Sequence, residues 1–164
     1  MNKIYQLVLF FSLLFVSAQA QNIYKDAVLL DANKATNAQQ QLDVDAYMNM
    51  MHPNVIEMGG GKELMKDIVG SQIQTYSQMG VTIERVEFED PSDVVKAGEE
   101  LHCTLSGTLK LKLGEDSFDN PINLLAASQD EGENWKFIDL SFYNENSLKL
   151  YLPDFNNALK IPTN

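Results

Sequence analysis

The feature that most constrains this chain is a change in the spacing of its apolar residues near Val81. Before that point apolar residues recur every three to four positions, as on one face of a helix. After it they alternate, as on one face of a strand. Helices that precede a set of strands, without alternating with them, favour an α+β arrangement. We therefore expect a single α+β domain whose N-terminal helices pack on a curved, mostly antiparallel sheet.

Two helices are expected at the start of this domain. Residues 23–42 contain no Gly or Pro and are rich in Ala, Gln and Leu, all of which favour helix. Asp43 can cap a short second helix over residues 44–51, because its carboxylate accepts hydrogen bonds from N–H groups of the first turn. His52 and Pro53 are expected to end that helix, since the residue before a proline is driven out of the α region. His52 is interpreted as a cap there.

A glycine run separates these helices from a third. Residues 54–58 are interpreted as a short strand. Residues 59–61 are all glycine and are expected to form a turn, because the spacing of a phosphate-binding loop and its Ser or Thr are missing. Residues 62–79 carry their apolar side chains along one stripe, which predicts an amphipathic helix ending before Gly80.

The alternation after Val81 predicts an antiparallel sheet. The expected strands are residues 81–89, 94–95, 100–113, 117–129 and 135–142, followed by a helical turn over 147–152. Ile83 and Val86 fall out of step in the first strand, which predicts a bulge near Arg85. The strand over 100–113 is the clearest, with leucines on one face and polar residues on the other.

The first twenty residues have the three parts of a secretory signal peptide. Lys3 gives a positive start, residues 7–16 form an apolar run too short to span a bilayer, and residues 18–20 form a small-x-small cleavage site. We expect a signal peptide over 1–20 and a single domain over 21–164, with a core at about 23–142 and a C-terminal tail over 143–164. The protein is therefore expected to be exported, periplasmic or extracellular, and soluble without a membrane span.

Charge and cysteine content exclude several classes of function. The chain has 12 Lys and Arg against 23 Asp and Glu, a formal net charge of −11, so nucleic acids and anionic membranes are poor partners. The single cysteine, Cys103, rules out an internal disulfide and is expected to be a buried, unreactive thiol. His102 has no second ligand at a metal-binding spacing. We expect no metal and no cofactor.

Four short segments, together with the order of the expected elements, resemble a known superfamily. They are residues 42–47 (LDVDAY), 51–55 (MHPNV), 60–63 (GGKE) and 135–139 (WKFID). This combination is similar to the nuclear transport factor two-like superfamily, also called SnoaL-like or the cystatin-like α+β cone, and to its small exported members of unknown role. The resemblance implies a cone-shaped barrel with a central pocket. It implies no particular reaction, because its members include isomerases, dehydratases, hydrolases and transport factors.

A second motif lies between the last two expected strands. Residues 128–135 (SQDEGENW) match S-x-D-x-G-x-x-W, similar to the Asp-box hairpin of sialidase-type propellers. Asp130 can accept turn N–H groups, Gly132 can adopt positive φ, and Trp135 can fold back over the turn. A propeller needs several copies and a much longer chain. We therefore interpret Ser128, Asp130, Gly132 and Trp135 as a structural hairpin.

Binding without catalysis is the leading functional hypothesis, because no catalytic set stands out in the sequence. The ligand is expected to be an apolar or amphipathic small molecule, or a partner, and the numerous methionines suit an adaptable apolar pocket. The residues expected to line this pocket are Tyr47, Met51, Met65, Tyr76, Phe137 and Asp139.

Two alternatives remain open. One is an acid–base enzyme of the isomerase, dehydratase or hydrolase type, with Asp139 as the carboxylate and Tyr47 or Tyr76 as the donor. The other is a dimerisation module that sets the polar sheet face of Thr104, Ser106 and Thr108 against a second copy of the chain.

Overall fold

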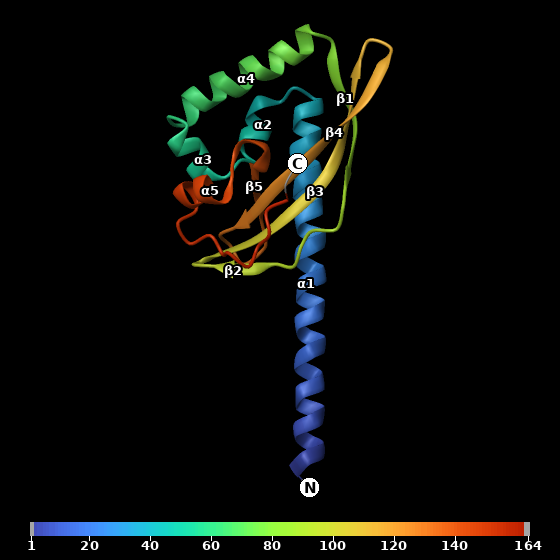
Figure 1. The fold of residues 1–164 in the computed structure, drawn as a ribbon, viewed down its shortest axis with the longest axis vertical. Coiled ribbons are helices and arrows are strands. Elements are labelled where there is room, and N and C mark those ends of the chain that lie inside the picture. Colours follow the sequence, from blue (N-terminus) through green and yellow to red (C-terminus); the bar gives the residue numbers. More distant parts are fainter. Residues whose placement is uncertain (1, 163–164) are drawn as a thin grey trace.

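The structure, a computed structural model, describes the backbone of residues 2–162 and the side chains of residues 21–162. Helices come first and strands follow, which confirms the expected α+β class (Figure 1). The helices are α1 (Asn2–Gln40), α2 (Val44–Met48), α3 (Pro53–Met58), α4 (Lys62–Gln78), the 3-10 helix η1 (Leu140–Phe142) and α5 (Glu145–Tyr151). The strands are β1 (Val81–Phe88), β2 (Val95–Ala97), β3 (Glu100–Leu113), β4 (Asp116–Ser128) and β5 (Lys136–Asp139).

The N-terminal leader expected from the sequence falls on residues 1–20, which lie outside the part of the chain whose side chains are described. The first described side chain, Gln21, pairs with the backbone of Val94: its Nε2 donates to the carbonyl at 3.2 Å, and its Oε1 accepts from the amide at 2.9 Å. Among the described residues, no helix has the length and apolar character needed to cross a membrane.

The five strands form one antiparallel sheet in the order β1-β3-β4-β5, with β2 paired to the start of β3. Among the described residues, no hydrogen-bonded pairing joins β1 to β5. The described strands therefore form an open sheet and do not close into the barrel expected from the resemblance. The strand expected over residues 100–113 is confirmed as β3. The bulge in β1 is also confirmed, because the register between β1 and β3 shifts between Ile83 and Arg85.

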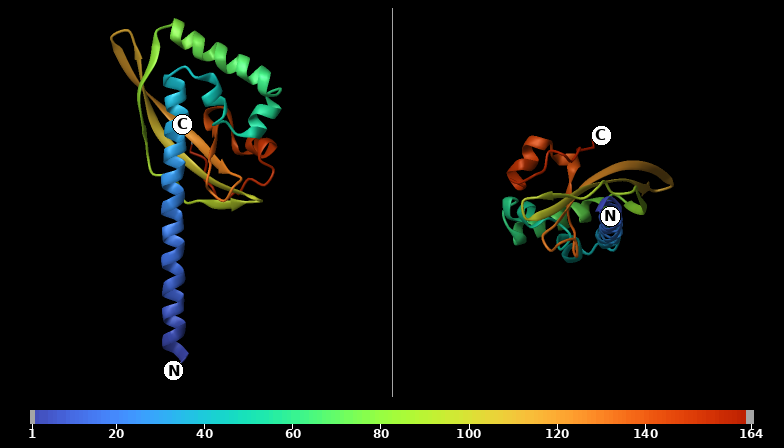
Figure 2. Two further views of the ribbon diagram at one scale, coloured as in Figure 1. Left: turned by 180° about the vertical axis from the view of Figure 1, so that it is seen from behind. Right: turned by 90° about the horizontal axis from the view of Figure 1, so that it is seen from below.

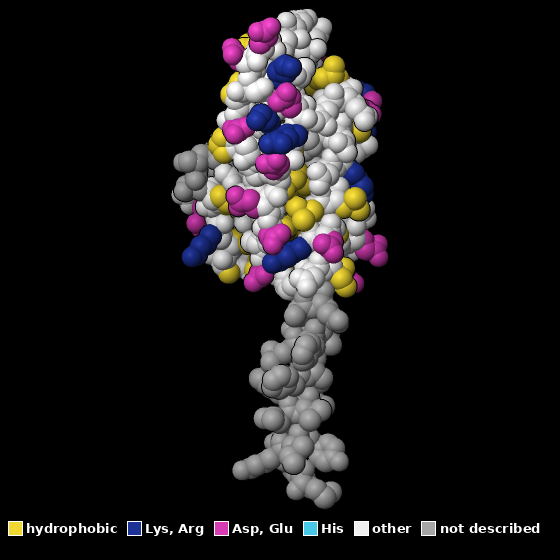
Figure 3. Space-filling view, turned by 90° about the vertical axis from the view of Figure 1, so that its right-hand side faces the viewer, with side chains coloured by type: hydrophobic (Ala, Val, Ile, Leu, Met, Phe, Trp, Pro, Cys, Tyr) yellow, Lys and Arg dark blue, Asp and Glu magenta, His cyan; other side chains and the backbone are white. Residues whose placement is uncertain are grey.

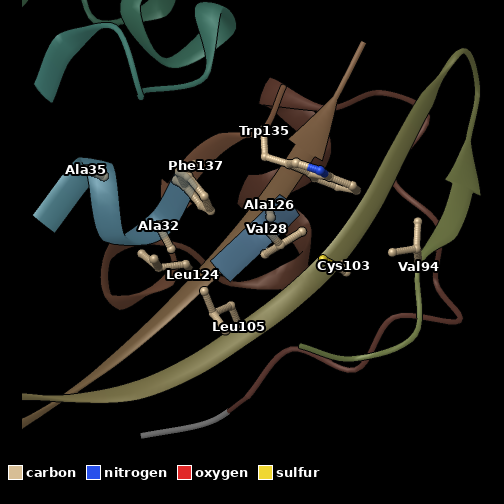
Figure 4. Close-up of a cluster of buried hydrophobic side chains, with 10 residues drawn as sticks. All are labelled: Val28, Ala32, Ala35, Val94, Cys103, Leu105, Leu124, Ala126, Trp135 and Phe137. Carbon is tan, nitrogen blue, oxygen red and sulfur yellow. The ribbon is translucent and has the colours of Figure 1, made fainter. Parts of the chain in front are cut away.

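A first apolar core lies between α1 and the sheet (Figure 4). Residues of β3 and β4 that face each other across the pair point to this side, such as Cys103 with Ala126 and Leu105 with Leu124. Small residues on α1, including Ala32, allow the helix to approach the strands closely. Burial raises the pKa of the Cys103 thiol to about 12, as expected for an unreactive side chain.

A second apolar core lies on the other side of the sheet, under α5 and the segment after it. Figure 2 shows α1 and this C-terminal segment on opposite sides of the strands. Leu125 of β4 and Ile138 of β5 are covered by Leu148 and by Phe155. The face of β3 expected to be polar and open is therefore covered in part: Thr104 is 7% exposed.

Two expected strands are wrong, in whole or in part, for local reasons. Residues 54–58 belong to helix α3, because Pro53 occupies its first turn and the His52 ring accepts a hydrogen bond from the Asn54 amide at 3.2 Å. A proline that was interpreted as ending one helix thus begins the next. The last strand ends at Asp139, whose carboxylate caps η1 by accepting from the Ser141 amide at 2.8 Å.

Candidate functional site

A groove of about 390 Å³ lies where α2, α3 and the start of α4 meet β5. Its lining residues, here called the methionine groove, are Met48, Asn49, Met51, Pro53, Ile56, Glu57, Gly61, Lys62 and Lys136. Backbone hydrogen bonds attach the turn between α2 and α3 to β5, because the Phe137 amide donates to the Met50 carbonyl and the His52 amide donates to the Phe137 carbonyl. The groove is therefore fixed to the sheet on one side.

The basic side chains of the groove come from two elements, α4 and β5. Lys136 Nζ donates to the Asn49 carbonyl at 2.6 Å, which holds the ammonium at the groove. Lys62 begins α4, and its N-cap Gly61 has no side chain to accept from the first-turn N–H groups. The lining thus combines two lysines with apolar residues and a single acidic residue, Glu57.

The residues expected to line a pocket are distributed over several places. Of these, Met51 alone belongs to the methionine groove. Phe137 lies in the first core, and Met65 packs against the second. Tyr76 is 50% exposed on α4 and does not line the groove.

Asp139 and Tyr47 are close enough for the Asp139 charge to act on the Tyr47 phenol. Burial, with a further contribution from the Asp139 charge, raises the pKa of Tyr47 to about 12. The pKa of Tyr143 is also raised to about 12, first by burial, then by Tyr151 and by Asp139. These phenols stay protonated at neutral pH and can donate hydrogen bonds. Asp139 itself is engaged with the Ser141 amide.

The S-x-D-x-G-x-x-W segment forms one hydrogen-bonded turn. Ser128 Oγ donates to Asp130 Oδ1 at 2.8 Å and accepts from the Gly132 amide at 2.9 Å. Asp130 accepts from the side-chain and backbone N–H groups of Asn134, which hold the pKa of its carboxyl below the usual range. The indole of Trp135 donates to the Gly132 carbonyl at 3.1 Å. Every one of these contacts is made within the turn, so the motif acts structurally here.

A cluster that sequence reasoning missed lies around Glu100. His102 Nε2 is 2.7 Å from Oε2 of this carboxylate, and His52 Nε2 is 3.5 Å from Oε1. Gln129 Nε2 donates to Oε1 at 2.6 Å. Both imidazoles are buried, at 0% exposure for His52 and 1% for His102. Within the part of the chain that is described, no group of three or more His, Cys, Asp or Glu side chains could hold a metal ion.

The spacing of Glu100 and His102 was the only sequence signal for this cluster, because residues i and i+2 of a strand share a face. His52 comes from a distant part of the chain, and the topology alone brings it to Glu100. The turn from α2 into α3 carries it there, next to the backbone of Phe137.

Comparison with known proteins gives similarities of fold alone. No family model matches the chain, and no curated protein does. A nuclear transport factor two-like protein of unknown function from Shewanella oneidensis is 16% identical, with a TM-score of 0.45 over 68% of this chain and 92% of that one. A second such protein, from Cytophaga hutchinsonii, is 22% identical, with a TM-score of 0.42 over 69% of this chain and 91% of that one.

An uncharacterised cystatin-fold protein from Novosphingobium aromaticivorans is 20% identical, with a TM-score of 0.32 over 67% of this chain and 96% of that one. None of these descriptions supplies a ligand or a reaction. The chain is similar in fold to nuclear transport factor two-like and cystatin-fold proteins.

Proposed function

We propose that this protein is an exported, non-catalytic binding protein that takes a small amphipathic molecule with an anionic head group in the methionine groove. The observation that carries the proposal is the lining: Met48, Met51 and Ile56 line the groove together with Lys62 and Lys136. Apolar pockets with a few placed polar groups are typical of small-molecule sites. Thioether side chains adapt to irregular apolar ligands.

The size and charge of the groove support this ligand class. Its volume of about 390 Å³ is at the small end of the roughly 300–1,000 Å³ typical of ligand sites. Each methylene transferred from water to such a lining contributes about 0.8 kcal/mol. The chain as a whole has a net charge of −11, so two neighbouring lysines are a local exception that an anionic head group can use.

Calorimetric titration with decanoate tests the proposal, with decyltrimethylammonium as a probe of similar chain length and opposite charge. We expect saturable binding of decanoate and weaker binding of the cation. Lys62→Gln and Lys136→Gln should each weaken decanoate binding by about two- to fivefold, as for partly exposed ion pairs. Lys160→Gln, an exposed lysine outside the groove, is the matched control. Absence of decanoate binding, or equal binding of both probes, would overturn the proposal.

An acid–base enzyme is the second candidate, favoured by the effect of the Asp139 charge on the Tyr47 phenol. Asp139→Asn separates the two functions. A binding protein should keep its decanoate affinity within about tenfold, because the change removes at most one charge-assisted hydrogen bond. An acid–base enzyme should lose about 10²–10⁴-fold in turnover. We favour binding, because Asp139 caps η1 and does not line the methionine groove.

A further inference from the structure

His52 connects two parts of the molecule through the two nitrogens of its ring. Nδ1 accepts a hydrogen bond from the Asn54 amide at 3.2 Å and so caps the start of α3. In the neutral ring the proton is therefore on Nε2, which lies 3.5 Å from Oε1 of Glu100 on β3. The residue is buried, at 0% exposure. The described contacts of His52 therefore fit a neutral imidazole.

A second proton on this ring would disturb these contacts. A doubly protonated imidazole accepts no hydrogen bond, so a proton on Nδ1 would face the Asn54 N–H group and break the cap of α3. Among the described ion pairs, Glu100 is the carboxylate that faces His52, and it also pairs with His102, whose Nε2 is 2.7 Å from Oε2. Glu100 has one negative charge and can balance one imidazolium, not two. Protonation of His52 in place thus breaks the cap and adds a buried charge.

Other titratable groups on the neighbouring elements do not replace Glu100. They are Tyr47 on α2, Glu57 on α3, Lys136 and Asp139 on β5, Tyr151 on α5, Glu99 before β3 and Asp154 after α5. Glu57, Glu99 and Asp154 are exposed, and the charges of exposed groups are largely screened. Asp139 caps η1. Among the described residues, none of these groups forms an ion pair with His52, so the buried ring has no second counter-charge.

Helix α3, which His52 caps, forms one wall of the methionine groove. The helix has six residues, and a helix so short is not stable by itself. Besides the cap, it is held by the Asn54 side chain, whose Nδ2 donates to the Tyr151 carbonyl at 2.6 Å, and by Val55 in the second core. Its residues in the groove lining are Pro53, Ile56 and Glu57, and Met51 precedes His52. Loss of the cap therefore loosens this wall.

We propose that α3 is an acid-sensitive wall of the methionine groove, and that proton uptake by His52 favours a state in which its ring leaves Glu100 and α3 opens. The open state binds one proton more than the closed state, so opening is favoured as the pH falls and disfavoured as it rises. An exposed imidazole has an ordinary pKa of about 6.5, so the effect belongs below that pH. Opening should weaken ligand binding, a consequence that rests on the proposed function.

Amide hydrogen exchange between pH 7 and 5, corrected for the intrinsic pH dependence of exchange, tests the opening without a ligand. The amides of Val55 and Gly59 donate within α3. Their protection should fall by about five- to tenfold from pH 6 to 5, the limit for one proton, while α1 amides keep theirs. His52→Asn should abolish this fall, because asparagine caps helices and does not titrate. His102→Gln removes the other histidine of the chain and should retain most of it, since the cap is still lost.

Two outcomes of this experiment overturn the proposal. One is an equal response of α3 and α1 amides to pH, which the unaltered protein decides even if a variant fails to fold. The other is a fall in protection that persists in His52→Asn.

Titration with decane-1-sulfonate, whose head group stays anionic over this pH range, tests the consequence for the groove. Binding should weaken from pH 7 to 5 in the unaltered protein and stay constant within about twofold in His52→Asn, because the fraction of closed protein sets the apparent affinity. Absence of binding at both pH values would contradict the proposed function alone, since the exchange experiment judges the opening of α3 separately. Binding that does not weaken although α3 opens would overturn the link between α3 and the groove.

Discussion

Trp135 joins three parts of the molecule through one side chain and its backbone. Its ring is fully buried in the first core and stands edge-on to Tyr24 of α1, with ring centres 6.4 Å apart. Its amide donates to Asp31 of α1 at 2.9 Å, and its indole donates to the hairpin. We expect Trp135→Ala to lower the free energy of unfolding by roughly 3–5 kcal/mol, the usual cost of emptying a large aromatic site. Urea denaturation measures it, and a change below about 1 kcal/mol would contradict this assignment.

A comparison of alanine substitutions at Gly132 and Gly114 isolates the effect of a close neighbouring side chain on thermal stability. Both have positive φ, 92° and 63°, so alanine is strained at either site. A Cβ at Gly132 would lie 2.5 Å from the Tyr24 ring, whereas a Cβ at Gly114 would meet nothing within 4 Å. We therefore expect Gly132→Ala to lower the thermal midpoint clearly more than Gly114→Ala does. Equal effects would show that only the backbone conformation matters at Gly132.

Glu100 should make stability depend on pH in the acid range. Its pKa in the folded protein is lowered from an ordinary value of 4.5, chiefly by the His102 hydrogen bond and by the neighbouring His52 ring, whose Nε2 lies 3.5 Å from Oε1. A carboxyl group whose pKa is lower in the folded than in the unfolded protein stabilises the fold at pH values above the unfolded-state pKa. This stabilisation is lost as the pH falls toward the folded-state pKa. Between about pH 5 and 3 the unaltered protein should lose stability more steeply than Glu100→Gln. Urea denaturation at each pH measures both, and parallel curves would contradict the expectation.

Which side chains could be predicted depended on how local their contacts are. The turn formed by Ser128, Asp130, Gly132 and Trp135 follows from eight consecutive residues, and its hydrogen bonds run inside that segment. The contact of Trp135 with Asp31 and that of His52 with Glu100 each join distant segments. The spacing of residues in the sequence cannot predict such contacts before the topology is known.

At the scale of elements, the C-terminal helix α5 is as much a part of the core as the strands. Leu148 is fully buried in the second core with Leu125, Ile138 and Phe155. We expect Leu148→Ala to destabilise the protein by about 2–5 kcal/mol. Leu150→Ala, on an exposed position of the same helix, should change stability by less than about 0.5 kcal/mol. Chemical denaturation measures the stability of both variants. Equal effects would mean that α5 does not cover the second core.

A helix or strand could be predicted where its residue pattern is compatible with only one kind of secondary structure. The alternation over residues 100–113 allows only a strand, and the out-of-step positions around Arg85 allow only an irregularity. Pro53 is compatible with two local structures, because a proline can follow the end of a helix or begin one. Which of them forms depends on whether the His52 ring caps the next turn. The burial of Thr104 could not be predicted from the sequence, because alternation tells which residues share a face and not what lies over that face.

At the scale of the whole molecule, charge is spread widely. Figure 3 shows acidic and basic side chains interspersed with small separate apolar areas on the side that includes β1, where Arg85 and Glu87 form an ion pair of 3.2 Å. The methionine groove differs from this background, because two lysines and a single acidic residue line it.

Export predicts a defined N-terminus for the mature protein. Cleavage after Ala20, as proposed from residues 1–20, would leave Gln21 first and keep its two hydrogen bonds to Val94. Mass spectrometry of the protein recovered from the exported fraction should find a chain that begins within a residue or two of Gln21. Recovery of intact residues 1–20 on that protein would contradict the proposal.

The second core has a consequence for the order of events during synthesis. Residues 145–161 are translated after every strand that they cover, so Leu125 and Ile138 have no apolar cover while the ribosome is still adding this segment. A nascent chain at that stage can form the α1 side of the sheet and cannot finish the other. Under the export proposed above, such late completion would leave time for translocation before the native state forms.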